Sequence, residues 1–343
     1  MEIRPIKKTE WPKLLAFNQV EYRPGHILTN KAYYDWQFDN VFNPNKDSYT
    51  ALGLFDKSGE LVGTIGLFPA PCNFFGQSIK CNWIANLIVK ESLRSLGYGA
   101  MLLKAAEKDF DLAVDHNVND LARPLFEKMG YQVNDIKRYL CVLNPAAAGV
   151  LAGEKNLDLK VFNNHHAAVP SAWEFKTVTC CGSEFDLFWE EVKPRYPVSI
   201  DRSNQYLSWR YINNPLVKYG VFTVFEGNKL GGFLVLRIEE ATDGMNKQTT
   251  GIKIGRIIDL IACEEAEEQL LLKAVEFCQN QGLGLIDFFF TGNFSTRSLE
   301  KIGFMDANVQ PYSLVPTLLN PIDRIKRTKH NFAFKLVNQN YFN

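Results

Sequence analysis

The sequence predicts an α+β fold made of two similar domains, each with a mixed, mostly antiparallel sheet flanked by helices. Three observations support this prediction. The chain has 343 residues, enough for two domains of about 150 residues each. Its segments recur in the same order in both halves, with Trp209 following Trp36, and Gly303 following Gly130, by 173 residues. In each half, strands come together first and alternate with helices later.

The first half contains the elements of one such unit. Apolar runs mark its strands, apolar residues at helical spacing mark its helices, and turn residues such as Gly59 separate the arms of a hairpin. In chain order, the predicted elements are a strand at 2–6, helices at 10–20 and 33–40, a hairpin turning at 56–60, a strand at 80–89, a helix at 100–110 and a strand at 110–115. A short helix and a last strand close the unit.

The second half repeats this order. Its predicted elements are a strand at 175–179, a helix at 184–192, a Trp-bearing helical segment at 206–215, a hairpin turning at 226–229, a strand at 255–263, a helix at 269–279 and a strand at 285–290. Residues 146–173 are rich in small side chains, and we interpret them as the connection between the domains. The predicted domains are therefore 1–145 and 174–343.

Composition and charge exclude several classes of function. Hydrophobic residues make up 46% of the chain, which is enough for packed cores. Lys and Arg number 38, as do Asp and Glu, so the overall charge gives no sign of a nucleic-acid partner. The seven Cys form no Cys-x-x-Cys pair, which argues against a metal site and suits a reducing interior. Without a long apolar run we expect no membrane span, and we expect a cytoplasmic protein.

The stretch Arg94-Ser-Leu-Gly97-Tyr-Gly99 lies between a predicted buried strand and a predicted helix. Glycines at a helix start allow several backbone N–H groups to point the same way, and the helix dipole adds partial positive charge. This arrangement suits a pyrophosphate, and Arg94 can pair with a phosphate oxygen. The stretch is not a Walker A loop, because no Gly-Lys-Ser/Thr follows. A plain turn between strand and helix is the alternative interpretation.

A second motif follows at Asn119-x-x-Ala122-x-x-Leu125-Phe126-x-Lys128-x-Gly130-Tyr131. At this spacing, the two motifs resemble those of the GNAT superfamily of acyl-CoA-dependent N-acyltransferases, and the resemblance covers nearly all of residues 1–140. It implies that acetyl-CoA binds in the first half as co-substrate. The cofactor-binding residues that it implies are Leu87, Ile88, Val89, Arg94, Ser95, Leu96, Gly97, Tyr98, Gly99, Ala100, Asn119 and Phe126.

The resemblance also implies which chemical groups the reaction needs. An amine attacks the thioester carbonyl, backbone N–H groups hold the thioester oxygen, and a base takes the amine proton. The family often has a carboxylate near the 80–89 strand, where this sequence has Asn86, which can only orient a water or the substrate. His116 is the predicted base, because an ordinary His has a pKa near ~6.5. Asp115 is a weaker alternative, and for His116 and Asn86 an ordinary structural position is the other interpretation.

The acid that protonates the departing thiolate is not evident. The family often places a Tyr where this sequence has Phe126, which has no hydroxyl group. Tyr98 and Tyr131 are close in sequence but do not match the acid position. Either the thiolate leaves unaided, or the domain is less active than its loop suggests.

The second half resembles the same fold more weakly and lacks the glycine loop. Its counterpart at 263–271, CEEAEEQLL, has four Glu and no Gly, and carboxylates at a helix start would repel a pyrophosphate. We therefore expect one cofactor per chain. Asp259 stands where the first half has Asn86.

The sequence as a whole predicts an acyltransferase that moves an acetyl group from acetyl-CoA to a small primary amine. Tandem forms with Trp83-x-x-Asn86-Leu87-x-Val89 resemble bacterial acetyltransferases of surface-polysaccharide and amino-sugar metabolism, which implies an amino sugar as acceptor. Two alternatives stay open: an aminoacyl transferase that uses aminoacyl-tRNA, and a non-catalytic protein that binds coenzyme A. The acyl chain length and the oligomeric state also stay open.

Overall fold

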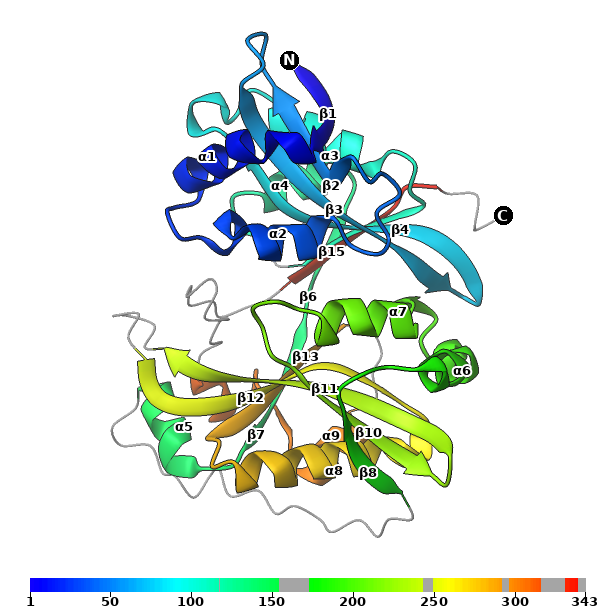
Figure 1. Ribbon diagram of the computed structural model, residues 1–343. Coiled ribbons are helices and arrows are strands. Elements are labelled where there is room, and N and C mark those ends of the chain that lie inside the picture. Colours follow the sequence, from blue (N-terminus) through cyan, green and yellow to red (C-terminus); the bar gives the residue numbers. More distant parts are fainter. Residues whose placement is uncertain (117, 154–172, 243–248, 292–295, 316–330, 339–343) are drawn as a thin grey trace. The chain divides into compact units, whose positions relative to one another are not determined.

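The structure is a computed structural model, and it describes residues 1–116, 118–153, 173–242, 249–291, 296–315 and 331–338. The chain forms two compact units (Figure 1). The first unit comprises Met1–Asp135, Lys193–Leu216 and Asn331–Asn343, and the second comprises Ile136–Val192 and Val217–His330. Each unit contains a mixed sheet with helices on its faces, so the predicted α+β class is confirmed.

The sheet of the first unit has eight strands among its described residues, in the order β1-β2-β3-β4-β5-β15-β6, with β9 beside β3. Neighbours from β1 to β4 are antiparallel, β4 and β5 are parallel, and β15 is antiparallel to both β5 and β6. The strands are β1 Glu2–Lys7, β2 Ser48–Phe55, β3 Leu61–Phe74, β4 Gln77–Val89, β5 Leu112–His116, β6 Gln132–Asp135, β9 Val198–Ile200 and β15 Asn331–Leu336.

Helices cover both faces of this sheet (Figure 1). One face packs against the first two helices through a core that includes Leu14 and Phe38. The other face packs against the next two helices around Ile84 and Leu102. These helices are α1 Trp11–Glu21, α2 Lys31–Phe38, α3 Tyr98–Glu107 and α4 Arg123–Lys128. The helices predicted at 10–20, 33–40 and 100–110 are therefore confirmed.

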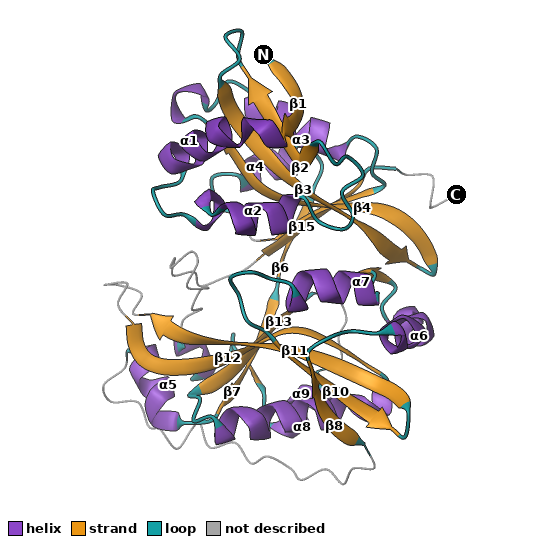
Figure 2. Cartoon of the chain, in the orientation of Figure 1, coloured by secondary structure: helices purple, strands orange, loops and turns teal. Residues whose placement is uncertain are grey.

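The second unit has the same strand order, β8-β10-β11-β12-β13-β7-β14, and its parallel step again lies between strands separated by a helix (Figure 2). Its strands are β7 Lys137–Val142, β8 Glu174–Val178, β10 Gly220–Glu226, β11 Lys229–Thr242, β12 Thr249–Ala262, β13 Leu285–Phe290 and β14 Met305–Asp306. Its helices are α5 Pro145–Ala152, α6 Ser183–Val192, α8 Glu264–Asn280 and α9 Arg297–Ile302. The repeat predicted from the sequence is thus visible in the strand order.

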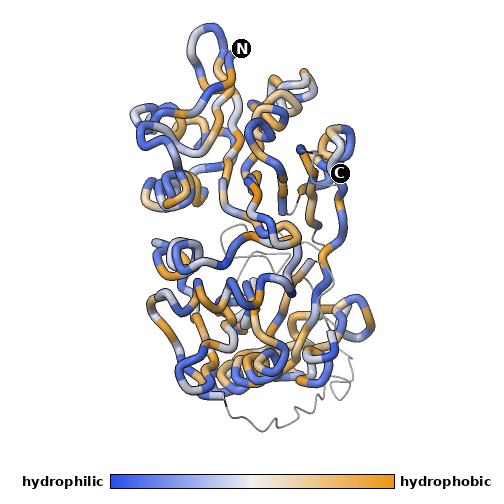
Figure 3. Tube along the Cα trace, turned by 90° about the vertical axis from the view of Figure 1, so that its right-hand side faces the viewer, coloured by the Kyte–Doolittle hydropathy of each residue, from blue (hydrophilic) through white to orange (hydrophobic). Residues whose placement is uncertain are grey.

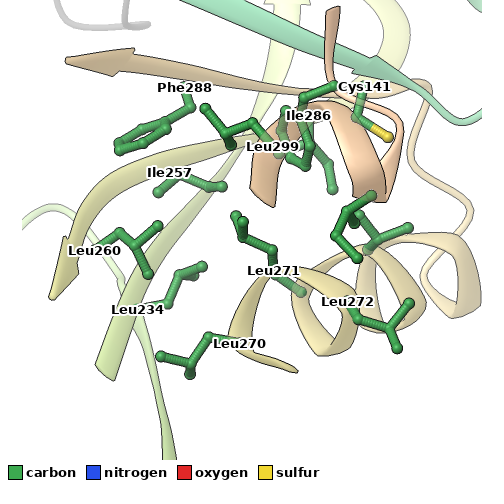
Figure 4. Close-up of a cluster of buried hydrophobic side chains, with 14 of the residues drawn as sticks. Cys141, Leu234, Ile257, Leu260, Leu270, Leu271, Leu272, Ile286, Phe288 and Leu299 are labelled. Atoms are coloured by element: carbon green, nitrogen blue, oxygen red, sulfur yellow. The ribbon is translucent and has the colours of Figure 1, made fainter. Parts of the chain in front are cut away.

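The core of the second unit lies between its sheet and helices α8 and α9. Figure 4 shows Leu271 of α8 among strand residues such as Leu234 and Ile257 and beside Leu299 of α9. Figure 3 shows that hydrophobic and hydrophilic residues alternate over short stretches of the chain, as amphipathic helices require. None of the helices in the described part of the chain has both the length and the hydropathy needed to cross a lipid bilayer.

The two sheets exchange one strand. Strand β15, from the end of the chain, lies between β5 and β6 of the first unit. Strand β7, which follows β6 in sequence, lies between β13 and β14 of the second unit. In each unit, a buried carboxylate forms an ion pair with a basic side chain on the exchanged strand. Lys335 Nζ lies 2.7 Å from Glu107 Oε2, and Arg138 lies 3.2 Å from Asp287 Oδ2.

The Trp residues of the repeated segments meet within the first unit. Trp209 lies in a π-helical turn, Ser208–Ile212, which follows helix α7, Asn204–Leu207. The Nε1–H of Trp36 donates to the Trp209 carbonyl at 2.8 Å, and the Nε1–H of Trp209 donates to the Trp36 carbonyl at 2.8 Å. Buried indole N–H groups need such partners, so this pair ties segment 193–216 to helix α2.

The predicted ranges 1–145, 146–173 and 174–343 describe the sequence repeat and stay a prediction. The compact units exchange segments, so they follow contacts rather than single cuts along the chain. Part of the predicted connection forms helix α5, in which the Asn144 side chain accepts a hydrogen bond from the Ala147 N–H at 3.2 Å. The rest of the connection, 154–172, lies outside the described residues.

Candidate functional site

Strand β4 contains a β-bulge close to its end. Its register with β3 shifts between Thr64 and Gly66, so that Asn86 and Leu87 of β4 together lie opposite Ile65. Asn86 has a φ of 57°, in the left-handed region that Asn tolerates better than most residues. A bulge bends the strand and changes the direction of its backbone groups. The predicted residue Asn86 is therefore the residue that redirects β4.

Strands β4 and β5 diverge just before this bulge. Their parallel pairing ends at Ile84 and Asp115. Beyond Ile84, the only described strand that pairs with β4 is β3. The predicted segment Leu87–Val89 therefore has one open edge, where backbone groups are available to a ligand. Consistent with this, the Val89 carbonyl accepts a hydrogen bond from a side chain, Arg94 Nε, at 3.1 Å.

The loop after β4 has a backbone that suits an anion. After a short 3-10 turn, Glu91–Leu93, Ser95 and Gly97 adopt left-handed conformations with φ of 68° and 83°. Left-handed residues in such loops turn successive N–H groups toward one side. Gly97 is the N-cap of α3, and no described side chain caps this helix start. The N–H groups at the start of α3, including those of Tyr98, Gly99 and Ala100, have no acceptor within the helix.

The two glycines of the loop differ in what surrounds them. A Cβ atom at Gly97 would meet no atom within 4 Å, so the space in front of this residue is open. A Cβ atom at Gly99 would lie 3.3 Å from Leu125 Cδ2, so Gly99 allows α3 to approach α4. Gly97 therefore fits an approaching phosphate, while Gly99 serves helix packing. Leu96, which precedes Gly97, is exposed.

Arg94 also holds the loop in place. Besides its bond to Val89, its guanidinium lies 3.6 Å from Glu21 of α1. Glu21 in turn accepts a hydrogen bond from the Glu91 N–H at 3.2 Å. Half of the Arg94 side chain is exposed, at 50%, so part of the guanidinium faces solvent. Its predicted contact with a phosphate stays a prediction, and the structure adds a bracing contact that the sequence did not reveal.

Asn86 and His116 lie at the ends of the two diverging strands. The Asn86 carbonyl accepts a hydrogen bond from the Tyr22 hydroxyl at 3.3 Å. His116 is the last residue of β5, and its ring centroid lies 6.1 Å from that of Trp83 on β4. Both residues thus lie at the opening between β4 and β5, and their catalytic roles stay a prediction.

Asp115 is the strongly perturbed group at this opening. Burial raises the pKa of its carboxyl to about 8, although a hydrogen bond from the His116 N–H to Oδ1, at 2.6 Å, lowers it. Asp115 is therefore protonated at neutral pH. From its place in the sequence Asp115 is only a weaker alternative base, because burial of a carboxyl at the end of a strand depends on the elements packed over it.

Asn119 and Phe126 have structural positions. The Asn119 side chain accepts a hydrogen bond from the Ala122 N–H at 2.8 Å and so orders the turn before α4. Phe126 of α4 is 1% exposed and packs against the edge of Tyr131, with ring centroids 4.9 Å apart. In this arrangement Phe126 supports α4 from within the core, and a direct contact with the cofactor stays a prediction.

The second unit keeps the strand geometry of the site. The register of β12 with β11 shifts between Val235 and Leu236, and its pairing with β13 ends at Ile257 and Phe288. A bulge and a divergence are therefore present here as well. Helix α8, by contrast, begins with acidic residues in its first turn, namely Glu264, Glu265 and Glu267. Their charge opposes a pyrophosphate at this position.

A separate cavity of about 870 Å³ lies in the first unit. It borders the last turn of α3 at Ala105 and the sheet at Leu52 and Leu67. The loop at Gly97 is at the other end of this helix, so the cavity is distinct from the open edge of β4. Within the described ranges, no group of three or more His, Cys, Asp or Glu is placed to hold a metal ion.

Comparison with known proteins agrees with this geometry. Residues 11–131 match the model of the acetyltransferase (GNAT) family. This range includes the bulged end of β4, the loop at Gly97 and the helix that carries Phe126. No curated protein sequence matches the chain.

Solved structures extend the likeness to the whole chain. A GCN5-related N-acetyltransferase from Anabaena variabilis has a TM-score of 0.63 and 12% identity, covering 98% of this chain and 73% of that one. A probable N-acyltransferase from Enterococcus faecalis has a TM-score of 0.63 and 11% identity, covering 99% and 74%. The N-myristoyltransferase of Saccharomyces cerevisiae, solved with bound myristoyl-CoA, has a TM-score of 0.59 and 12% identity, covering 98% and 78%. At these identities the likeness shows the fold.

Proposed function

We propose that the protein is an acyltransferase that moves an acetyl group from acetyl-CoA to a primary amine, a proposal supported by the match of residues 11–131 to the acetyltransferase (GNAT) family. The observation that carries the proposal is the order of three features along the chain. A bulged strand with an open edge leads to a loop with left-handed Ser95 and Gly97, and this loop starts an uncapped helix.

The proposed binding of acetyl-CoA uses two parts of this arrangement. The pyrophosphate lies against the N–H groups of the 95–100 loop and helix start, where the helix dipole favours negative charge. The pantetheine arm follows the open edge of β4, and the backbone at Leu87–Val89 holds the thioester oxygen. The open space at Gly97 supports this proposal, because a phosphate needs that space.

In the proposed reaction, the amine nitrogen attacks the thioester carbon between β4 and β5. His116 is the base that takes the amine proton, because a neutral imidazole nitrogen can accept one. Asn86 orients the amine or a water through its side-chain amide. Both residues stand at the opening where the two strands diverge.

We further propose an amino sugar as the acceptor. This rests on the resemblance of Trp83-x-x-Asn86-Leu87-x-Val89 to tandem acetyltransferases of amino-sugar metabolism. The similar N-myristoyltransferase was solved with a much longer acyl-CoA, so the acyl chain length needs its own test. Comparing acetyl-CoA with hexanoyl-CoA and myristoyl-CoA provides it, and we expect the highest kcat/KM for acetyl-CoA.

The experiment that tests the function is a thiol-release assay with acetyl-CoA and a panel of amines. The panel contains amino sugars, alkylamines and amino acids. We expect amine-dependent release of coenzyme A, highest with an amino sugar. Binding of coenzyme A without release for any amine would favour the non-catalytic alternative. Transfer from aminoacyl-tRNA, tested in parallel, would favour the aminoacyl transferase.

A further inference from the structure

The last two residues of β5 point to opposite faces of the first sheet, because side chains alternate along a strand. Asp115 is in register with Ile84 of β4 and with Ala333 of β15, and both belong to the core under α3 and α4. His116 lies on the other face, where its ring is near that of Trp83. Adjacent residues thus serve different sides of the same opening.

The two faces correspond to the two proposed substrates. Gly97 begins α3, and α3 packs on the face that carries Asp115. The opposite face carries α2, since Trp83 is in register with Phe68, and Phe68 stacks on Phe38 of α2. A thioester held between β4 and β5 therefore has Asp115 on the side from which the cofactor comes and His116 on the other side.

Three other elements contribute titratable groups to the face of the sheet that carries Asp115. These groups are Glu107 of α3, Tyr131 before β6 and Lys335 of β15, and Lys335 lies 2.7 Å from Glu107. Lys335 is paired with Glu107, and burial is the main cause that raises the pKa of the Asp115 carboxyl. Strand β5 itself contributes the His116 N–H, which donates a hydrogen bond to Asp115 Oδ1.

Two other residues on this face, Phe126 and Tyr131, are unsuitable as proton donors to the thiolate. Phe126 has no exchangeable proton and is buried in the core. Tyr131 is 4% exposed, and burial together with Glu107 raises the pKa of its hydroxyl, which makes it a weaker acid than an ordinary Tyr. A carboxyl group that is protonated at neutral pH is matched to a thiolate, since an ordinary thiol has a pKa near ~8.5.

We propose that Asp115 is the acid that protonates the coenzyme A sulfur, an inference that rests on the proposed acetyl transfer. The amine nitrogen forms a bond to the thioester carbon, and the carbon–sulfur bond breaks. The amine proton passes to His116, and the Asp115 proton passes to the thiolate. His116 then loses its proton to water and Asp115 regains one, so that amide and thiol are the only products.

The test compares Asp115→Asn with the matched control Asp109→Asn, an exposed carboxylate at the far end of α3. We expect Asp115→Asn to lower kcat at least tenfold while coenzyme A affinity changes less than twofold. The wild-type kcat should fall as the pH rises through about 8, because the acid is lost, and this fall should be absent from Asp115→Asn. Asp109→Asn should have the wild-type kcat and the same decrease of kcat at alkaline pH.

A second variant, Asp115→Glu, keeps the test decisive if Asp115→Asn does not fold. The kcat of Asp115→Glu should still fall at alkaline pH, but at a different pH from the wild type. A fall at the same pH as in the wild type would contradict the proposal. A wild-type kcat in Asp115→Asn would also contradict it. If the wild type binds coenzyme A but releases no thiol with any amine, the proposed function fails instead, so the two failures are distinguishable.

Discussion

Asp115 couples the stability of the first unit to pH. Burial raises its pKa to about 8 in the folded chain, whereas an unfolded Asp titrates near ~3.9. Between these pH values the folded state holds one proton more than the unfolded state at this residue. The contribution of Asp115 to stability is therefore fully present below about pH 4 and is lost as the pH rises through about 8.

Replacing Asp115 with Asn should remove this dependence. Relative to Asp115→Asn, the free energy of unfolding of the wild type should fall by about 1.4 kcal/mol per pH unit between about pH 4 and 8. Urea unfolding of both proteins at pH 5, 6 and 7 measures the difference. A difference that stays constant over this range would contradict the raised pKa.

Single residues differ in how far their conformation and contacts could be predicted from the sequence. Gly97 was predictable, because a glycine between a strand and a helix marks a special backbone conformation, and its φ of 83° agrees. The pairing of Arg94 with Glu21 was not predictable, because the two residues meet only when α1 packs beside the loop. The raised pKa of Asp115 was not predictable either, because it depends on burial of the end of β5 in the folded unit.

At the scale of elements, the end of β4 determines the site. Its bulge at Asn86 turns the strand, and its divergence from β5 after Ile84 creates the open edge. The left-handed conformation at Asn86 costs a β-branched residue more than it costs Asn or Gly. The identity of this residue therefore matters for the shape of the strand as well as for the proposed chemistry.

Two substitutions at Asn86 separate shape from chemistry. Asn86→Gly accepts a φ of 57° and should change the free energy of unfolding by less than about 1 kcal/mol. Asn86→Val should cost about 1–2 kcal/mol more, and it should weaken coenzyme A binding because the open edge is distorted. Urea unfolding and coenzyme A titration of both variants check this. Equal stability and affinity would show that the bulge is unimportant.

Most elements could be predicted, but the bulge could not. The helix at 11–21 and the hairpin between β2 and β3 follow from local periodicity and turn residues. A bulge adds one residue to a strand without changing its apolar character, so NLIV at 86–89 gives no signal for it. Its position depends on the register with β3.

At the scale of the whole molecule, the exchange of β7 and β15 links the ends of both repeats. Both strands are short segments of similar length, so neither their composition nor their length indicates that either one belongs to the other sheet. Strand β15 contributes buried Ala333 and also Lys335, which pairs with Glu107. Asn331 adds a hydrogen bond from its side-chain amide to the Val118 carbonyl at 2.8 Å.

Deleting residues 331–343 should therefore damage the first unit. The deletion leaves the edges of β5 and β6 unpaired and leaves the Glu107 carboxylate buried without Lys335. We expect loss of coenzyme A binding and rapid hydrogen exchange in β5. A deletion of residues 339–343 alone is the control, and it should keep both properties. Unchanged exchange in the longer deletion would contradict the strand assignment.

The central claim is that each chain binds one acyl-CoA at the loop that begins α3. Isothermal titration of coenzyme A tests it most directly, with Gly97→Ala beside the matched control Gly59→Ala, since both glycines have positive φ and open space at Cβ. We predict one site per chain, an affinity at least about tenfold weaker in Gly97→Ala, equivalent to about 1.4 kcal/mol, and an unchanged affinity in Gly59→Ala. No heat at millimolar coenzyme A, two sites per chain, or equal losses in both variants would contradict the claim.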